Sequence, residues 1–264
     1  MTLSPPLVSA IISTFNSARF IEGCLADLAA QTIADRIEII VVDSVSEEGE
    51  GAIVRRWQER YPNIRYTRTE RRETVYAAWN RAIRMAQGTY LTTANTDDRH
   101  KANAFERMGR VLDMRPDVAL VYADVLETAT ENETFERCTP TRVLRWHDWS
   151  RDTLLTQGCF IGPQPMWRRC VHAEYGFFDE SLVSSGDFEF WLRISQTHSF
   201  HHIREPLGLY LSRPDSVEHR HCDLKALEDA RILSAYRRAA RDGAILRRIP
   251  ESRPENRMAG PNLA

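Results

Sequence analysis

The sequence lacks the basic excess that a general nucleic-acid-binding protein carries. Its 264 residues have a formal net charge of -2 at pH 7, whereas such proteins typically show a strong basic patch. Most of the positive charge is arginine, because only Lys101 and Lys225 are lysines. Arginine suits bidentate pairing with phosphates and carboxylates, but genome composition produces the same bias, so we give it little weight. We expect no nucleic-acid partner.

Cysteine motifs and long apolar runs are also absent from the sequence. The five cysteines are scattered and form neither a CxxC pair nor a metal-binding pattern with histidine. They therefore indicate reduced thiols in a cytosolic protein. No signal peptide is predicted, since no basic region at the N-terminus leads into an apolar run. No apolar run approaches the ~20 residues that span a bilayer. We therefore expect a cytoplasmic protein, and if it meets the inner membrane face, it does so from the surface.

The apolar runs that are present alternate with helical patterns over residues 7–100. Strands are predicted for the β-branched runs 7–13, 37–42 and 64–67 and for a shorter run beginning near Tyr90. Their nearly continuous apolar character is typical of strands buried on both faces of a parallel sheet. Helices between them are indicated by apolar residues at helical spacing, as in Ile21, Cys24, Leu25 and Leu28. This order predicts an α/β fold with a doubly wound, mostly parallel sheet.

The second half of the sequence is less regular. It predicts helices over 101–114, around Phe188 and over 224–241, and strands over 118–125, 200–203 and 207–211. Residues 128–168 show no sustained periodicity, and such a stretch inside a compact domain is usually a functional loop or lid. Residues 249–264 hold three prolines and no apolar pattern, which predicts a disordered tail.

Polar residues follow the predicted strands at their carboxyl ends. They are residues 14–16, Asp43 and residues 95–98. In a parallel sheet ligands bind beyond the carboxyl ends of the strands, so we expect these residues to meet in one crevice. Asn95 and Asp97 lie two apart, so in an extended segment their oxygens point the same way and can hold a hard cation against a pyrophosphate. The alternative is an Asx-rich turn that caps the next helix.

Five sequence segments carry motifs in a fixed order. Each motif alone is weak evidence for a protein family, but the ordered set is specific. The segments are Val-Ser-Ala-Ile-Ile-Ser-Thr-Phe-Asn at 8–16, Ile-Ile-Val-Val-Asp-Ser-Val-Ser at 39–46, Val-Tyr-Ala-Ala-Trp-Asn at 75–80, Asn-Thr-Asp at 95–97 and Ser-Gly-Asp-Phe-Glu-Phe-Trp-Leu-Arg at 185–193. Through them, most of the sequence resembles glycosyltransferase family 2, whose members are inverting sugar transferases with a GT-A fold. Asn-Thr-Asp stands where that family has its Asp-x-Asp metal motif.

The resemblance implies one GT-A domain over residues 1–248. Its parts would be a nucleotide-sugar-binding half at 1–100, an acceptor-binding half at 101–220 and a C-terminal helix within 221–248. The implied reaction moves a sugar from a nucleotide-diphosphate donor to a hydroxyl of a glycan or lipid-linked acceptor. A UDP-sugar is the favoured donor. The reaction inverts the anomeric centre and would serve polysaccharide or glycoconjugate biosynthesis.

The resemblance also implies roles for single residues. Thr14 and Asp43 fall where the family holds the base and ribose of the donor, and a carboxylate suits this task because it accepts hydrogen bonds. Asp97 falls on the aspartate that binds Mg²⁺ or Mn²⁺ against the diphosphate, where a cation stabilises charge on the leaving group. Asp187 falls on the catalytic base. The other expected donor contacts are Phe15, Asn16, Arg72, Asn80, Asn95, Thr96 and Arg213, and the expected acceptor contacts are Gln164 and Trp167.

Three departures from the family pattern bear on the cation. Asn95 replaces the first acid of the metal motif, which weakens cation binding. Ser44 replaces a second acid after Asp43, and Arg213 stands in the place of a histidine. An arginine can neutralise a diphosphate but cannot ligate a cation. These changes keep open a catalytically silent nucleotide-sugar-binding module. A nucleotidyltransferase is disfavoured, because its first strand would usually lead into a glycine-rich loop.

Several residues also have structural interpretations that the sequence leaves open. Ser184 and Asp187 fit a capping box at a helix start. Asn80 suits a structural hydrogen bond, and Trp167 suits an acceptor sugar and the core equally well. The eight arginines between residues 231 and 257 would contact an anionic membrane surface or form a solvated face.

Overall fold

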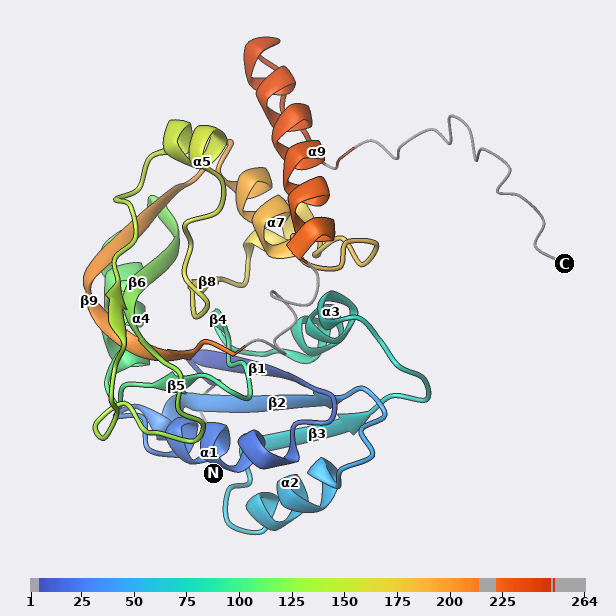
Figure 1. Ribbon diagram of the computed structural model, residues 1–264, viewed down its shortest axis with the longest axis vertical. Helices are drawn as coiled ribbons and strands as arrows, with labels where there is room; N and C mark the ends of the chain where they lie inside the picture. The colour runs from blue at the N-terminus through green and yellow to red at the C-terminus, as the bar shows by residue number, and fades with distance from the viewer. Residues whose placement is uncertain (1–4, 214–221, 248, 250–264) are drawn as a thin grey trace, which may run out of the picture.

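The computed structural model describes residues 5–213, 222–247 and 249, which fold around one curled sheet (Figure 1). The strands are β1 (Val8–Thr14), β2 (Ile37–Asp43), β3 (Ile64–Arg68), β4 (Tyr90–Thr93), β5 (Arg99–His100), β6 (Val118–Thr128), β7 (Arg142–Leu144), β8 (Met166–Arg168) and β9 (Ser199–Leu211). Their order is β3-β2-β1-β4-β8-β6-β9-β5, and β7 pairs with β6. The α-helices are α1 (Ala18–Ala29), α2 (Glu50–Gln58), α3 (Val75–Met85), α4 (Ala104–Met114), α5 (Arg151–Gln157), α6 (Val171–Tyr175), α7 (Gly186–Ile194) and α9 (Cys222–Arg241).

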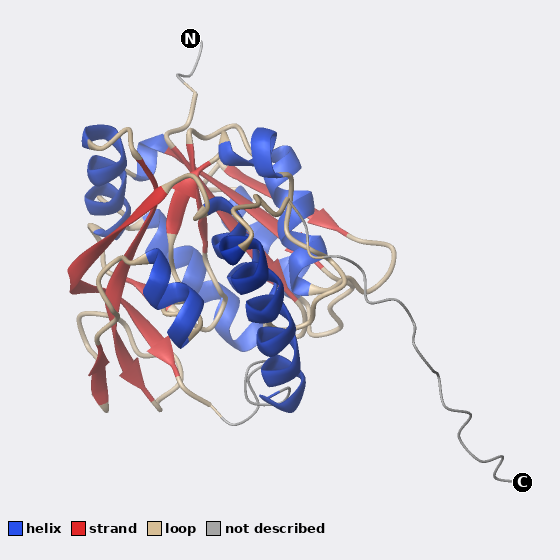
Figure 2. Cartoon of the chain, turned by 90° about the horizontal axis from the view of Figure 1, so that it is seen from above, coloured by secondary structure: helices blue, strands red, loops and turns tan. Residues whose placement is uncertain are grey.

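The first half of the chain forms four neighbouring parallel strands of the sheet. β1 pairs in parallel with β2 and β4, and β2 pairs in parallel with β3. Side chains of one strand enter two different cores: Ile11 packs in the cluster that contains α3, whereas Ile12 packs in the cluster that contains α1 and α4. Figure 2 shows helices on both sides of the sheet. Both strand faces therefore need apolar residues, which explains the continuous apolar runs.

The second half adds antiparallel pairings and one long strand. β8 lies between β4 and β6 and pairs antiparallel with both, so it joins the two halves of the sheet. β9 runs parallel to β6, with an irregularity in register where Asp124 lies opposite Pro206. The two predicted strands 200–203 and 207–211 are therefore one strand. Proline has no N–H to donate, but a bulge accommodates it, so the strand continues past Pro206.

Residues 128–168 contain more regular structure than the sequence predicted. They include β7, α5 and β8, so the prediction that this stretch is one irregular loop was wrong. β5 and α6 were also not predicted. Each of these elements is at most seven residues long, which is too short to show a periodicity of its own. The neighbouring strands and helices determine their conformation.

The C-terminal helix α9 is close to its prediction at 224–241. It buries Glu228, Ile232, Tyr236 and Ala239, whose spacing places them on one face of the helix. Figure 1 shows α9 lying along α7 and extending beyond it. Ile249 is also buried in the core, whereas the rest of the predicted tail lies outside the described residues. The domain limits remain a prediction.

A buried ion pair lies within α7, and a hydrogen bond from α9 reaches it. Glu189 is fully buried, and Arg193, one turn later, donates to it from Nε at 3.2 Å and from a second guanidinium nitrogen. Nη1 of Arg193 donates to the carbonyls of Tyr175 and Phe177, at 2.6 and 2.9 Å. The hydroxyl of Tyr236 on α9 donates to Glu189 at 2.7 Å. The two buried charges thus have several hydrogen-bond partners, as burial requires.

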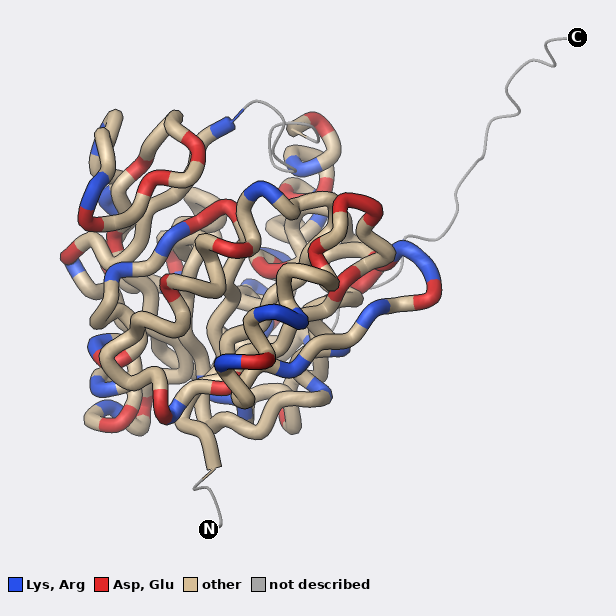
Figure 3. Tube along the Cα trace, turned by 90° about the horizontal axis from the view of Figure 1, so that it is seen from below, with Lys and Arg blue, Asp and Glu red and all other residues tan. Residues whose placement is uncertain are grey.

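Charge is distributed without a single-sign face in the view of Figure 3, where Lys and Arg alternate with Asp and Glu along the trace. Among the described residues, no helix combines the length and apolar character that crossing a membrane requires.

The buried ion pair predicts a large effect of substituting Arg193. Arg193→Met keeps most of the side-chain volume but leaves the Glu189 carboxylate buried without its cation, so the free energy of unfolding should fall by about 3–5 kcal/mol. Urea denaturation followed by fluorescence measures this change. The control is Arg115→Met, because the Arg115–Asp117 pair is exposed and such pairs contribute little. Equal losses in the two variants would contradict the prediction.

Candidate functional site

The carboxyl ends of β1, β2 and β4 lie side by side at one edge of the sheet. Thr14 is the register partner of Asp43, and the N–H of Ser44 donates to the carbonyl of Thr14 at 2.9 Å. The N–H of Ala94 donates to the carbonyl of Ile11 at 3.0 Å, which holds the segment after β4 against β1. The hydroxyl of Thr14 is buried and has no hydrogen-bond partner within the described part of the chain. The polar strand ends therefore lie at the same edge of the sheet, and the crevice between them stays a prediction.

Asp43 is fully buried and accepts hydrogen bonds through both carboxylate oxygens. Oδ1 accepts from the N–H of Ser46 at 2.7 Å, and Oδ2 accepts from the hydroxyl of Tyr66 at 2.6 Å and from Arg68 at 2.9 Å. Burial alone would raise the pKa of Asp43. The hydrogen bonds from Tyr66 and Ser46 and the charge of Arg68 outweigh burial and hold the pKa below its usual value. Asp43 is therefore a fixed negative charge at the end of β2.

The turn after β1 is fastened to the loop after β2. Asn16 has a positive φ of 49°, its side-chain oxygen accepts from the N–H of Glu47 at 2.9 Å, and its own N–H donates to Ser46 Oγ at 3.2 Å. The guanidinium of Arg72 lies over the Phe15 ring, 3.3 Å from its centroid. These contacts place Phe15, Asn16 and Arg72 beside the end of β2. They leave the predicted contacts with a donor untested.

Ser44, which stands where the family has a second acid, links β2 to α3. Its hydroxyl donates to the carbonyl of Glu73 at 3.1 Å and accepts from the N–H of Glu73 at 2.5 Å. Thr74 follows and caps α3 by accepting from the N–H of Ala77 at 3.2 Å. The start of α3 is therefore tied to the end of the strand that carries Asp43.

Residues 95–98 form a polar turn that contacts the end of β9. Asp97 Oδ2 accepts from Arg213 Nε at 3.1 Å and Nη2 at 2.9 Å. Asp98 is buried and accepts from Asn95 Nδ2 at 3.0 Å and from the N–H of Leu211 at 3.3 Å. Burial, together with the nearby charge of Asp97, raises the pKa of Asp98. The turn thus holds one carboxylate against an arginine and buries a second.

The next residue, Arg99, anchors this turn to α1. Its side chain is almost fully buried, lies 3.8 Å from Asp27 and donates to the carbonyl of Glu133 at 2.9 Å. A Cβ at Gly23 would stand 2.0 Å from an Arg99 nitrogen, so a larger residue here would displace the guanidinium from α1. The buried arginine fixes the position of the turn that precedes it.

The turn at Asp97 offers some of the oxygen ligands that a divalent cation needs. Asn95 offers an amide oxygen and Asp97 a carboxylate, one oxygen of which is shared with Arg213. In the described ranges, no three or more His, Cys, Asp or Glu side chains form a group that could hold a metal ion. Mg²⁺ commonly binds through one or two carboxylates together with substrate phosphates. Asn95 and Asp97 therefore fit a cation that binds together with a diphosphate.

Asp187 lies in the first turn of α7 and contacts α3. Its Oδ1 accepts from the hydroxyl of Tyr76 at 3.2 Å and from the N–H of Phe188 at 2.8 Å. Burial raises the pKa of Asp187 above its usual value. A Cβ at Gly186 would stand 2.8 Å from the Tyr76 ring, so glycine permits this close approach. The raised pKa suits a proton acceptor.

The capping box that the sequence left open for Ser184 and Asp187 is not formed. Ser185 is the N-cap of α7 and makes no side-chain capping hydrogen bond. The hydroxyls of Ser184 and Ser185 are both buried without a hydrogen-bond partner in the described structure. The carboxylate of Glu228 on α9 instead accepts from the N–H groups that precede the helix. A contact across more than forty residues of sequence replaces the local one.

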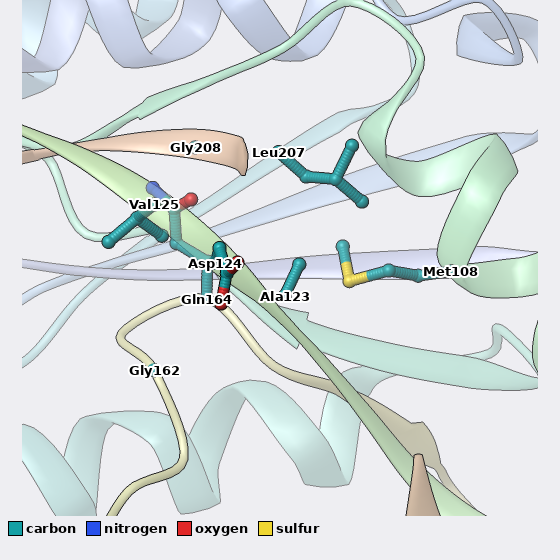
Figure 4. A pocket seen from close by; sticks show the side chains of 8 residues that line it. All are labelled: Met108, Ala123, Asp124, Val125, Gly162, Gln164, Leu207 and Gly208. Carbon is teal, nitrogen blue, oxygen red and sulfur yellow. The ribbon is translucent and has the colours of Figure 1, made fainter. Parts of the chain in front are cut away.

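Three further predicted contacts are Asn80, Trp167 and Gln164. Asn80 is buried and exchanges hydrogen bonds with the backbone of Phe178, at 2.9 and 3.0 Å. Trp167 has no exposed surface and donates to His172, so in this structure it belongs to the core. Gln164 donates to the carbonyl of Arg99 at 3.0 Å and lines a small buried pocket against Asp124 and Gly208 (Figure 4). All three side chains have structural partners here.

Tyr66, Arg68 and Tyr76 touch predicted site residues but were not themselves predicted. Tyr66 and Arg68 lie two apart on β3, so their side chains share a face, and register places Arg68 opposite Asp43. The contact of these two residues with Asp43 could be predicted only if β3 were known to lie beside β2. Tyr76 lies within the motif at 75–80, but its partner Asp187 is 111 residues away.

The sequence matches a known family over most of this fold. The family model for glycosyl transferase family 2 matches residues 9–161, more than half of the chain. The chain belongs to glycosyl transferase family 2. Membership confirms the predicted family. Among the curated family relatives, the chondroitin synthase of Escherichia coli is 24% identical over 200 residues, which cover 76% of this chain and 28% of that protein. The chain thus spans well under half of that relative.

Solved glycosyltransferase structures confirm the predicted GT-A fold. S. aureus TarS 1-349, solved in complex with UDP-GlcNAc, has a TM-score of 0.67 at 16% identity, covering 87% of this chain and 66% of that chain. The mannosyltransferase PcManGT from Pyrobaculum calidifontis, solved with GDP-Man and Mn²⁺, has a TM-score of 0.64 at 19% identity, covering 93% and 68%. At these identities the likeness concerns the fold alone.

The environment of Asp43 predicts a pH-dependent contribution to stability. Its pKa is lowered in the folded state, so its contribution is complete above the ordinary value of 3.8 and is lost as the pH falls through the folded pKa. Asp43→Asn should therefore lower the free energy of unfolding by about 1–3 kcal/mol at pH 7, and the difference from wild type should shrink below about pH 4. Denaturation at several pH values measures it. Asp35→Asn, at an exposed site, is the control, and a difference independent of pH would contradict the prediction.

Proposed function

We propose that the chain transfers a sugar from a nucleotide-diphosphate donor to an acceptor hydroxyl with inversion of the anomeric centre. The observation that carries the proposal is the meeting of Thr14, Asp43 and the turn 95–98 at one edge of the parallel sheet, where such sheets bind ligands. Family membership supports the same reaction. A UDP-sugar is the favoured donor, since an aspartate such as Asp43 can accept a hydrogen bond from a uracil imide or a ribose hydroxyl. The UDP-GlcNAc bound by TarS also supports it.

In the proposed reaction Asp187 is the general base. Its carboxylate takes the proton of the acceptor hydroxyl while that oxygen attacks the anomeric carbon. The bond from the anomeric carbon to the diphosphate oxygen breaks, its electron pair leaves with the diphosphate, and attack from the opposite face inverts the configuration. Tyr76 and the N–H of Phe188 both donate to Oδ1, and these bonds orient the carboxylate. Oδ2 is then the oxygen that takes the proton of the acceptor hydroxyl. A raised pKa brings the base closer to the operating pH.

The leaving diphosphate gains negative charge, and the turn 95–97 offers two ways to stabilise it. Arg213, held 2.9 Å from Asp97, supplies a guanidinium that can pair with phosphate oxygens. Asn95 and Asp97 would hold Mg²⁺ or Mn²⁺, which supplies a fixed positive charge at the diphosphate when bound. Thr96, which is buried, stays a predicted contact of the donor.

A catalytically silent nucleotide-sugar-binding module is the second candidate. It is favoured by one observation, the engagement of Asp97 with Arg213 beside a neutral Asn95. A glycan or lipid-linked acceptor, a role in polysaccharide or glycoconjugate biosynthesis, a cytoplasmic location and a peripheral contact of the arginine-rich end with an anionic membrane all stay predictions.

The role of Asp187 predicts a selective loss of turnover. Asp187→Asn keeps the shape of the side chain but cannot take a proton, so nucleotide release from the donor should fall at least ~100-fold while donor affinity stays nearly unchanged. Turnover is measured on UDP-glucose, UDP-GlcNAc and GDP-mannose, and affinity for the nucleotide by calorimetry. In wild type, kcat/KM should fall as the pH drops through a pKa above 3.8, because only the deprotonated carboxylate is a base.

Two results would count against this role. Turnover per folded molecule could survive in Asp187→Asn while stability falls, which would make Asp187 only a structural residue at the helix start. Absence of nucleotide release by wild type on all three donors, with UDP binding retained, would favour the silent module.

The turn 95–97 predicts how a cation affects UDP binding. Asp97→Ala should remove the gain in UDP affinity that Mn²⁺ produces, and Asn95→Asp should increase that gain because it adds a carboxylate ligand. Calorimetry of UDP binding with Mn²⁺ and with excess EDTA measures both. Asp35→Ala is the control, because Asp35 is exposed and precedes β2 at its other end. Equal UDP affinity of wild type in Mn²⁺ and in EDTA would instead assign charge neutralisation to Arg213.

A further inference from the structure

The loop before Asp187 directs three consecutive backbone N–H groups at one carboxylate. Glu228 Oε1 accepts from Val183 at 2.8 Å, and Oε2 accepts from Ser184 and from Ser185, both at 2.9 Å. Glu228 belongs to α9 and is 8% exposed. Successive N–H groups that converge in this way form a concave site for an anion. Here the anion is a side chain of the same protein.

This carboxylate holds the backbone that leads into α7, including the N–H of the N-cap residue Ser185. The first N–H groups of a helix have no partner within the helix, and α7 makes no side-chain capping bond from its own N-cap residue. A negative charge at this end is also favoured by the helix dipole. Without Glu228, the N–H groups of residues 183–185 would be left for solvent at a largely buried position. The loop conformation therefore depends on a residue of α9.

Glu228 is itself held firmly. Ile232, Tyr236 and Ala239 continue the buried face of α9, and Tyr236 donates to Glu189 on α7. Further along α9, Arg237 donates to the carbonyls of Leu155 and Thr156, at 2.6 and 3.2 Å. A helix fastened at these points gives the loop a rigid support. Because Asp187 lies two residues beyond Ser185, the position of the loop determines the position of Asp187.

We propose that Glu228 is a positioning residue for catalysis, which holds the 183–185 loop so that Asp187 meets the acceptor hydroxyl. The inference rests on the proposed role of Asp187 as general base. Glu228 touches neither Asp187 nor, by this account, the substrates, and it acts through the loop backbone. It makes α9 part of the acceptor half of the site, while the donor half remains independent of it.

The test compares two substitutions that leave no cavity. Glu228→Gln keeps the size of the side chain but replaces one accepting oxygen with an NH₂ group that faces N–H donors. Tyr236→Phe is the matched control, because it removes another hydrogen bond between α9 and α7 without touching residues 183–185. Both full-length variants are assayed below their unfolding transitions for nucleotide release from the donor that wild type uses best among UDP-glucose, UDP-GlcNAc and GDP-mannose. UDP affinity is measured by calorimetry.

We expect kcat of Glu228→Gln to fall ~10- to 100-fold, since a displacement of about 1 Å of a catalytic group has effects of this size. KM for the donor and UDP affinity should stay within about twofold of wild type, because the donor half is untouched. Tyr236→Phe should keep kcat within about threefold. A merely structural role of Glu228 would lower stability without this split between kcat and KM.

Three outcomes would overturn the inference. Wild-type kcat in Glu228→Gln would show that the loop does not need the carboxylate. A parallel loss of kcat in Tyr236→Phe would assign the effect to α9 docking in general. If wild type releases no nucleotide although UDP binds, the proposed transferase function fails, and the positioning role fails with it. Normal wild-type turnover together with normal turnover of Glu228→Gln would reject the positioning role alone.

Discussion

Burial of the parallel strands on both faces is the constraint on which this structure depends. Ile11 and Ile12 are neighbours in β1, yet they enter different cores on opposite sides of the sheet. Where helices cover both faces, a polar side chain along a strand would lose its water without gaining a partner. Most polar groups are therefore confined to the strand ends, where Thr14, Asp43 and the turn 95–98 meet. Ser9 shows the alternative inside the sheet, since its hydroxyl donates to the buried Glu38 at 2.6 Å.

This constraint explains which parts of the molecule the sequence could predict. β1 and β2 were recognisable because two-sided burial leaves a run of apolar residues, and their polar ends followed from the same pattern. β8 was not, because its three residues become a strand only through pairing with β4 and β6. The partners of Asp43 required the register of β3, and the partner of the loop before Asp187 required the docking of α9. A local sequence pattern does not show these side-chain contacts, since they join residues 23 to 45 positions apart.

Several arginines bind more than one buried acceptor at once, which a lysine could not do. The arginine-rich composition alone did not reveal this structural role. Arg193 bonds a carboxylate and two carbonyls at once, and Arg168 donates to the carbonyls of Val118 and Leu112 behind β8. A planar group with five donors can satisfy several buried acceptors in fixed directions, whereas an ammonium group offers three donors on a flexible stem. The same property lets Arg213 hold Asp97 through two nitrogens at the site that is proposed to bind the diphosphate.

The nucleotide end and the base end of the proposed site are joined by a short path through α3. Asp43 ends β2, and the next residue, Ser44, exchanges hydrogen bonds with Glu73 immediately before α3. Three residues on, Tyr76 donates to Asp187 across the close contact with Gly186. The substitution of an acid by Ser44 therefore has a structural consequence: a hydroxyl can both donate to a carbonyl and accept from an N–H, which a carboxylate cannot. Asp187 is thus located by α3 on one side and by Glu228 on the other, and neither support lies beside it in the sequence.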